Sequence, residues 1–147
     1  MLRREKGFTL IELLIVVAII GIIAAIAVPN LLTAIQRSKR SRTVADIRAI
    51  GTALGSYQVD NNIFPLGSNT DLATVAFKGA LVEGMTTSYF EGASKDAWGT
   101  DFYYSGDTQG YTLKSWGKDR TTNQDSEFNS DIVYVNGSFT SPSSVVE

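Results

Sequence analysis

The stretch KGFTLIELLIVVAIIGIIAAIAVPNLL, residues 6–32, decides how this chain must be organised. It is almost entirely apolar and contains one carboxylate, Glu12, after which no charge occurs from Leu13 to Gln36. A helix of about 20 apolar residues crosses a bilayer core, so the segment is long enough to span a membrane. A carboxylate in such a segment is costly unless it is paired, and Glu12 therefore needs a partner.

Three interpretations of this segment are open. A cleaved secretory signal is favoured by the basic start and by Ala25-Ile26-Ala27, but the apolar run exceeds the usual span of about 7–15 residues. An ordinary uncleaved anchor leaves Glu12 without a purpose. Removal of residues 1–7 after Gly7 would instead create an amine at Phe8, with Glu12 four residues later on the same helix face. The amine of the same chain or of a neighbouring copy would then neutralise Glu12.

The helical pattern continues beyond the apolar run. Apolar residues recur at three- and four-residue spacing, which predicts one helix from Phe8 to about Val59; they are Val44, Ile47, Ile50, Leu54 and Tyr57. Such a helix is too long for the remaining domain to pack along its whole length, so its first half must be buried in lipid or against other copies. Pro29 lacks a backbone donor, so we expect a kink there.

Residues 36–147 are expected to form one α+β globular domain. Two hairpins are predicted, 102–104 with 111–113 around the turn 106–110, and 132–135 with 138–140 around Asn136-Gly137, whose dipeptide favours a type I′ turn. The expected fold is one long N-terminal helix packed against a small antiparallel sheet of three or four strands. A short helix is predicted near 71–82, Trp98 and Trp116 are predicted in the core, and the tail 141–147 is predicted to be disordered.

Composition excludes several classes of function. The chain of 147 residues has no Cys and no His, which removes disulfides, cysteine nucleophiles and Ser-His-Asp triads and makes zinc and iron sites improbable. Residues 1–48 contain eight Lys/Arg and three Asp/Glu, whereas residues 49–147 contain five Lys/Arg and twelve Asp/Glu, a net charge of −7. No nucleic-acid partner is expected for so acidic a domain.

A polar loop between the two hairpins, residues 115–131, contains four carboxylates and no regular period. Such a long polar loop is usually either functional or disordered. Oxygen ligands for Ca²⁺ could converge there from Asp119, Asp125, Asn129 and Asp131. The spacing is not that of an EF-hand, and from charge alone a solvated acidic loop without an ion is favoured.

The helix start has a recognisable pattern: a short basic leader, then Gly7-Phe8, Glu12 at the fifth position after Gly7, and Pro29 within the apolar run. It resembles the processing site of type IV pilins and pseudopilins. The resemblance implies removal of the leader 1–7 by a prepilin peptidase, N-methylation of Phe8, and a role for Glu12 in assembling a helical filament. Segment 8–35 would be the transmembrane and filament-core half of the helix.

Four later stretches resemble the major pseudopilins of type II protein secretion: 57–65, 95–99, 115–119 and 129–132. In that family the loop binds calcium, which implies ligands at Asp119, Asp125, Asn129 and Asp131 and a backbone carbonyl near Trp116. Ala97, Arg120 and Asn129 depart from the residues usual in the family at those places.

The expected function is that of a structural subunit, not an enzyme: the major pseudopilin of a type II secretion system. The alternatives are a type IV pilin of a surface fibre and, from another class, a membrane-tethered enzyme or binding domain. The resemblance implies copies of this chain, the peptidase, an inner-membrane assembly platform and minor pseudopilins as partners. It implies an inner-membrane location before assembly and a periplasmic or cell-surface filament afterwards. Basic residues flank both ends of the apolar run, so the positive-inside rule does not decide its orientation.

Overall fold

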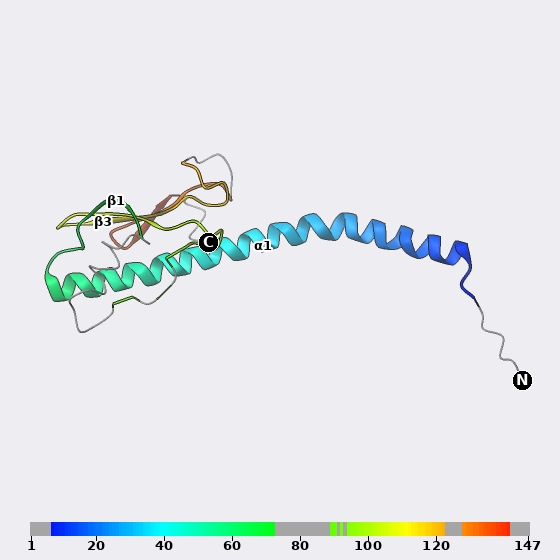
Figure 1. Ribbon diagram of the computed structural model, residues 1–147, viewed down its shortest axis with the longest axis horizontal. Helices are drawn as coiled ribbons and strands as arrows, with labels where there is room; N and C mark the ends of the chain where they lie inside the picture. The colour runs from blue at the N-terminus through cyan, green and yellow to red at the C-terminus, as the bar shows by residue number, and fades with distance from the viewer. Residues whose placement is uncertain (1–6, 73–88, 91, 93, 123–127, 142–147) are drawn as a thin grey trace, which may run out of the picture. The chain divides into compact units, whose positions relative to one another are not determined.

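A computed structural model of the chain describes residues 7–72, 89–90, 92, 94–122 and 128–141. Within those residues, one helix is followed by five strands (Figure 1): α1 (Leu10–Asn61), β1 (Gly67–Asp71), β2 (Tyr103–Gly106), β3 (Tyr111–Ser115), β4 (Ile132–Val135) and β5 (Ser138–Ser141). The chain divides into two compact units, Met1–Gln36 and Arg37–Glu147, and α1 contributes to both. The predicted α+β class, with one long N-terminal helix and an antiparallel sheet, is confirmed.

Helix α1 begins two residues later than predicted and ends two residues later. Its last turn is closed by Asn62, which adopts a left-handed conformation with φ of 58°. The Asn62 backbone N–H donates to the Gln58 carbonyl at 2.8 Å, a frequent way of ending a helix. The turn formers at 60–62 and Pro65 thus stop the helix where the sequence places them.

The strands form one antiparallel sheet in the order β1-β2-β3-β4-β5, so each strand pairs with the next along the chain. Both predicted hairpins are present, β2 with β3 and β4 with β5. Asn136 and Gly137 have φ of 46° and 92°, and two positive values in succession are what a type I′ turn requires. The Asn136 side chain also accepts a hydrogen bond from the Tyr111 N–H at 2.7 Å, which ties this turn to the start of β3.

Strand β1 was not predicted. The sequence indicated a short helix beginning at Asp71, but Asp71 is the last residue of β1, and 73–88 lie outside the described residues. The sheet therefore has five strands among the described residues, one more than the upper prediction. The segment GSNTD has one residue of a strand-favouring type, Thr70, among residues that are rare in strands. It joins the sheet through main-chain pairing with β2, which a pattern of side chains does not reveal.

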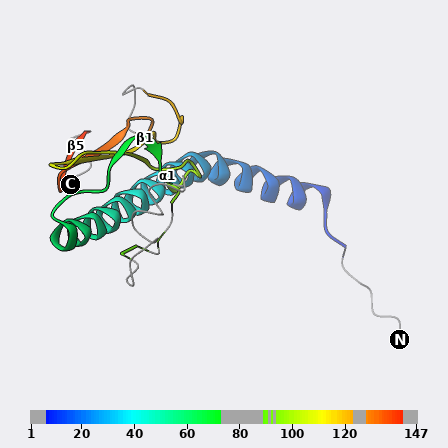
Figure 2. The same cartoon turned by 60° about the vertical axis from the view of Figure 1, so that its left-hand side comes forward.

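The sheet packs on the second half of α1, as the two views of Figures 1 and 2 agree. Ile47, Ile50 and Leu54 of the helix are fully buried, as are Phe102, Tyr104 and Leu113 of the sheet layer. All residues of this core lie between Val44 and Tyr134, so the second unit has a closed core of its own.

The two tryptophans, Trp98 and Trp116, differ in how deeply they are buried. Trp98 is buried in the core, as predicted, but Trp116 is half-buried outside it, and the prediction for Trp116 was wrong. Tyr111, Leu113 and Ser115 point inward along β3, so the alternation of a strand places residue 116 on the other face. On that face, the Trp116 ring packs against the Tyr103 ring, with centroids 5.4 Å apart. The Lys114 ammonium nitrogen lies 4.8 Å from the centroid of the Trp116 ring.

Candidate assembly and ion-binding sites

The first half of α1 exposes its large apolar side chains on all sides. Phe8 is 77% exposed and Leu10 80% exposed, and every large apolar residue from there to Ile35 is also exposed. The helix is long and apolar enough to cross a membrane, by length and composition. Exposed apolar area on this scale is unfavourable in water, so lipid or other protein must cover it.

Thr9 and Glu12 form a reciprocal cap at the start of α1. The Glu12 N–H donates to Thr9 Oγ1 at 3.3 Å, while the Thr9 N–H donates to Glu12 Oε2 at 2.9 Å. The Thr9 hydroxyl also donates to the same carboxylate oxygen at 2.6 Å. This is a capping box, in which each side chain satisfies a backbone donor that the first helical turn leaves free.

The capping box gives Glu12 a local partner that was not predicted, although Thr-x-x-Glu before an apolar run is the sequence signature of this motif. Pairing of Glu12 with the Phe8 amine stays a prediction, because that amine exists only after cleavage at Gly7.

The described fold does not itself require Gly7 or Gly21. A Cβ added at either position would meet nothing within 4 Å. Pro29 lies inside α1, where the Asn30 amide donates to the Ile26 carbonyl at 3.1 Å and the Thr33 hydroxyl donates to the Pro29 carbonyl at 3.1 Å. The kink at Pro29 stays a prediction.

The loop after β3 is held to the rest of the domain by Asp96, a buried carboxylate. Asp96 Oδ2 accepts a hydrogen bond from Ser115 Oγ at 2.8 Å, and its Oδ1 accepts from the N–H groups of Trp98 and Thr100, both at 2.9 Å. The Gly117 N–H donates in turn to Ser115 Oγ at 3.3 Å. One carboxylate therefore fixes both the Trp98 turn and the beginning of the loop.

Arg120 makes a second link between the same two segments. It has a left-handed backbone, with φ of 60°, and its guanidinium donates to the Trp98 carbonyl at 2.8 Å. Asp119, one of the predicted ligands, is half-buried, and its carboxylate accepts from the Thr121 N–H at 3.2 Å. The turn 117–120 therefore presents Asp119 on a segment that is restrained at both ends.

Three backbone carbonyl oxygens converge on Gly117. A Cβ at this position would lie 3.0 Å from the Phe128 oxygen and 3.1 Å from each of the Asn129 and Ser130 oxygens, and φ is +70°. Only glycine leaves this space open. This contact brings residues 128–130 against the turn that carries Asp119, and the Phe128 carbonyl accepts a hydrogen bond from the Lys118 N–H at 3.0 Å. Ca²⁺ is bound by carboxylate and carbonyl oxygens, so the oxygen groups on the two segments that meet here fit a hard cation.

The other predicted ligands are only partly brought together. Asp131 is buried, and its Oδ2 lies 3.9 Å from the Lys114 ammonium. Asp125 lies outside the described residues, and within the part of the chain that is described no three acidic side chains are grouped closely enough to hold a metal ion. The carbonyl cradle at Gly117 was not predicted, because main-chain oxygens have no signature in a sequence.

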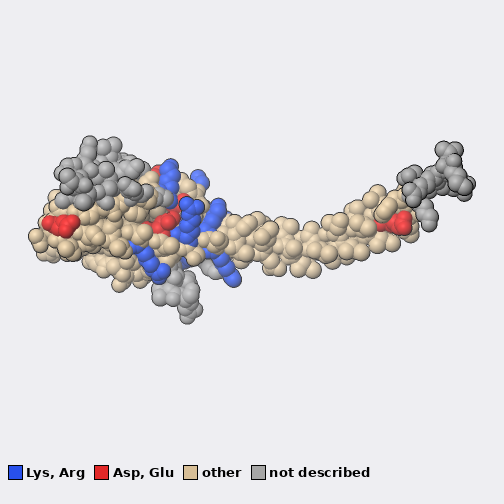
Figure 3. All heavy atoms as spheres, turned by 90° about the horizontal axis from the view of Figure 1, so that it is seen from below, with Lys and Arg blue, Asp and Glu red and all other residues tan. Residues whose placement is uncertain are grey.

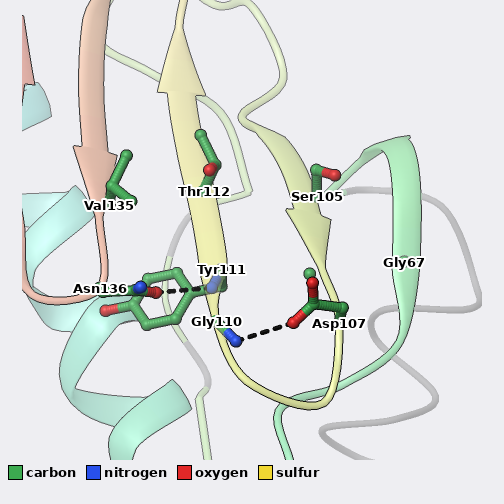
Figure 4. A pocket seen from close by; sticks show the side chains of 9 residues that line it. Gly67, Ser105, Asp107, Gly110, Tyr111, Thr112, Val135 and Asn136 are labelled. Carbon is green, nitrogen blue, oxygen red and sulfur yellow. Dashed lines mark hydrogen bonds between the residues drawn. The ribbon is translucent and has the colours of Figure 1, made fainter.

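A hollow of about 440 Å³ lies at the ends of β2 and β3 (Figure 4). Two of its polar side chains, Asp107 and Asn136, form hydrogen bonds that stabilise turns. Asp107 accepts from the N–H groups of Gln109 and Gly110 at 2.7 and 2.9 Å, and these two bonds lower the pKa of Asp107. Asn136 is bonded to Tyr111, as described above. These groups hold turns and do not converge as an acid-base pair.

A long helix with an exposed apolar half, a capped start at Thr9 and Glu12, and a meander sheet on its second half define a pilin-like protein. Residues 2–28 match the prokaryotic N-terminal methylation motif, and residues 30–135 match the family described as type II secretion system (T2SS), protein G. The chain belongs to this family, the major pseudopilins of type II secretion, and is thus a structural protein rather than an enzyme.

Curated relatives agree with this assignment. The chain is 36% identical over 108 residues to the type II secretion system core protein G of Vibrio cholerae serotype O1, covering 70% of this chain and 72% of the relative. It is 33% identical over 122 residues to the protein of that name from Escherichia coli (strain K12), covering 79% and 83%. It is 31% identical over 140 residues to the protein of that name from Pseudomonas aeruginosa, and this match covers 85% of this chain and 94% of the relative.

Proposed function

We propose that this chain is anchored in the inner membrane by residues 8–35 and is then assembled, with many copies of itself, into a periplasmic filament that drives secretion. The observation that carries the proposal is the fully exposed apolar half of α1, on a chain whose second unit already has a closed core. That core cannot take up the apolar segment, so lipid must cover it before assembly and neighbouring copies afterwards.

The start of the helix is the proposed processing and assembly site. Gly7 is not required by the described fold, and both Gly7 and Phe8 are exposed, which suits recognition by a prepilin peptidase. Cleavage would remove residues 1–7 and leave the Phe8 amine beside the Thr9–Glu12 cap. The carboxylate would then bind that amine or the amine of a neighbour, and the charge pair would lower the cost of placing both in an apolar filament core. The assembly platform and minor pseudopilins are the remaining proposed partners.

The loop 115–131 is the proposed calcium site. The carbonyl oxygens of residues 128–130 at Gly117 support it, together with the position of Asp119 on the restrained turn. The residues that would hold the ion are Asp119, Asp125, Asn129 and Asp131, with the carbonyl near Trp116. A bound Ca²⁺ would supply a crosslink between the two ends of a loop in a chain that has no cysteine.

A deletion strain complemented with the intact gene tests the function. We expect the deletion to abolish the release of exported proteins while surface fibres are unchanged, and the Glu12→Ala variant to be made and inserted but not assembled. Loss of surface fibres with normal secretion would contradict the proposal and favour a type IV pilin. Normal filaments from Glu12→Ala would refute the role of the carboxylate in assembly.

A further inference from the structure

Helix α1 carries a ring of positive charge immediately after its apolar half. The sequence RSKRSR, residues 37–42, has four basic residues and no acid, and no acidic residue occurs anywhere between Glu12 and Asp46. We call Arg37, Lys39, Arg40 and Arg42 the basic collar. Figure 3 shows Lys and Arg side chains gathered in one band of the molecule.

The collar surrounds the helix and does not form a stripe along it. Successive residues of an α-helix are about 100° apart, so positions 37, 39, 40 and 42 project toward four different sides. Arg37 is exposed, the Arg42 side chain is 69% exposed, and Lys39 and Arg40 are half-buried. Arg42 lies 3.7 Å from the Asp46 carboxylate, and such a partly exposed pair is weak.

The distance along the helix places the collar at a definite depth. The charge-free run Leu13–Gln36 has 24 residues, which is about 36 Å of helix at 1.5 Å per residue. A bilayer hydrocarbon core is about 30 Å thick. If the run spans the core, the collar begins in the headgroup layer, where its exposed side chains can reach lipid phosphates.

We propose that the basic collar binds anionic phospholipid headgroups at the membrane face next to the globular domain. The proposal rests on the proposed insertion of residues 8–35. The positive-inside rule disfavours four positive charges on the side of the membrane where the globular domain lies. Binding to the phosphate layer explains why they nevertheless follow the apolar run. The subunit must leave this layer when it is extracted into a filament.

An acidic surface of a neighbouring copy is the other candidate partner, since residues 49–147 have a net charge of −7. The ring arrangement favours lipid over this partner. The two exposed residues, Arg37 and Arg42, project about 140° apart around the helix. A layer of headgroups meets both of these sides, whereas a flat protein interface would meet only one of them.

The chain has no cysteine, so a single fluorophore can be attached to a Ser41→Cys variant of the full chain. Ser41 is exposed within the collar. The labelled protein is reconstituted into vesicles of phosphatidylcholine with phosphatidylglycerol, and energy transfer is measured to an acceptor on one lipid or the other. We expect transfer to favour phosphatidylglycerol, with an enrichment on the order of fivefold for each engaged charge at low salt, falling as salt is raised.

Two charge-matched variants test the collar itself. Arg37→Gln with Arg42→Gln should reduce the preference severalfold, whereas Arg48→Gln with Lys95→Gln removes the same net charge outside the collar and should retain it. Equal transfer to both lipids would overturn the proposal. So would a preference that depends on protein density and not on lipid charge, which would point to a neighbouring copy.

A second label, on an Ile22→Cys variant, separates this proposal from membrane insertion. Quenching of that label by brominated acyl chains would show that the apolar half is inserted. Quenching at position 22 with no lipid preference at position 41 would overturn the collar alone. Absence of quenching at position 22 would overturn insertion and the collar together.

Discussion

Gly51 of helix α1 lies directly against the ring of Tyr134 on β4. A Cβ at position 51 would be 2.6 Å from Tyr134 Cε1 and 3.0 Å from the Tyr111 hydroxyl oxygen. The close approach of helix and sheet at this point therefore depends on the absence of one methyl group.

The Gly51→Ala variant is expected to be less stable, although alanine favours a helix over glycine by about 1 kcal/mol. Overpacking of a core costs about 1–3 kcal/mol, and here the obstructing group is a ring held between Tyr111 and Phe139. The net loss should appear as a lower midpoint in urea unfolding of the soluble fragment 37–147, which contains the whole core.

Gly55→Ala is the matched control, one turn further along the same helix. A Cβ there would meet nothing within 4 Å, so only the helix propensity changes, and we expect stabilisation of roughly 0.5–1 kcal/mol. If both variants shift stability in the same direction, the proposed close contact with Tyr134 is wrong.

The capping box allows the two roles of Glu12 to be separated. Thr9→Ala removes the cap and should cost about 1 kcal/mol in helix stability, with faster amide exchange in the first turn of α1. Thr9→Ser keeps a hydroxyl and should retain protection. Filament yield, measured after mass spectrometry confirms processing, should fall less for Thr9→Ala than for Glu12→Ala.

Equal filament yields from Thr9→Ala and Glu12→Ala would mean that the cap alone explains the carboxylate. The predicted bond between Glu12 and the Phe8 amine would then be unnecessary.

The calcium proposal predicts a melting temperature that depends on the ion. Calcium at one hundred times its dissociation constant would stabilise fragment 37–147 by about 2.7 kcal/mol relative to chelator. Asp119→Ala should reduce this difference. Gly117→Ala should reduce it as well, because a Cβ at 3.0–3.1 Å from three carbonyl oxygens would displace the segment that carries the predicted ligand Asn129.

Asp107→Ala provides the control, because this carboxylate stabilises a turn outside the loop 115–131. It should lower the melting temperature with and without calcium while leaving the difference between them intact. Identical melts of the unaltered fragment in millimolar calcium and in chelator would exclude the site.

Side-chain pattern explains which parts of this architecture were predictable. The alternation of Tyr111, Leu113 and Ser115 and the Asn136-Gly137 turn are local features, and both hairpins follow from them. Strand β1 depends on main-chain pairing, and the cradle at Gly117 on main-chain oxygens, so neither has a side-chain signal. The capping box at Thr9 has a sequence signature, but the Phe8 amine was the only partner predicted for Glu12.

Two buried tyrosines predict a loss of stability at alkaline pH. Burial raises the pKa of Tyr111 to about 12, with a further contribution from Tyr134, and burial raises the pKa of Tyr104 as well. An exposed tyrosine has a pKa of about 10, so the unfolded chain loses these protons first. The stabilising contribution is therefore complete below about pH 10 and is lost as pH rises through the folded-state values.

The unfolding free energy of fragment 37–147 should accordingly fall between about pH 10 and pH 12, with absorbance of tyrosinate appearing as the fragment unfolds. Tyr111→Phe removes one of the two groups and should make the fall shallower. Tyr104→Phe should also be less stable at neutral pH by about 1 kcal/mol, because the Tyr104 hydroxyl donates to the Pro65 carbonyl at 2.6 Å. An unchanged pH profile in Tyr111→Phe would show that this phenol does not govern the alkaline transition.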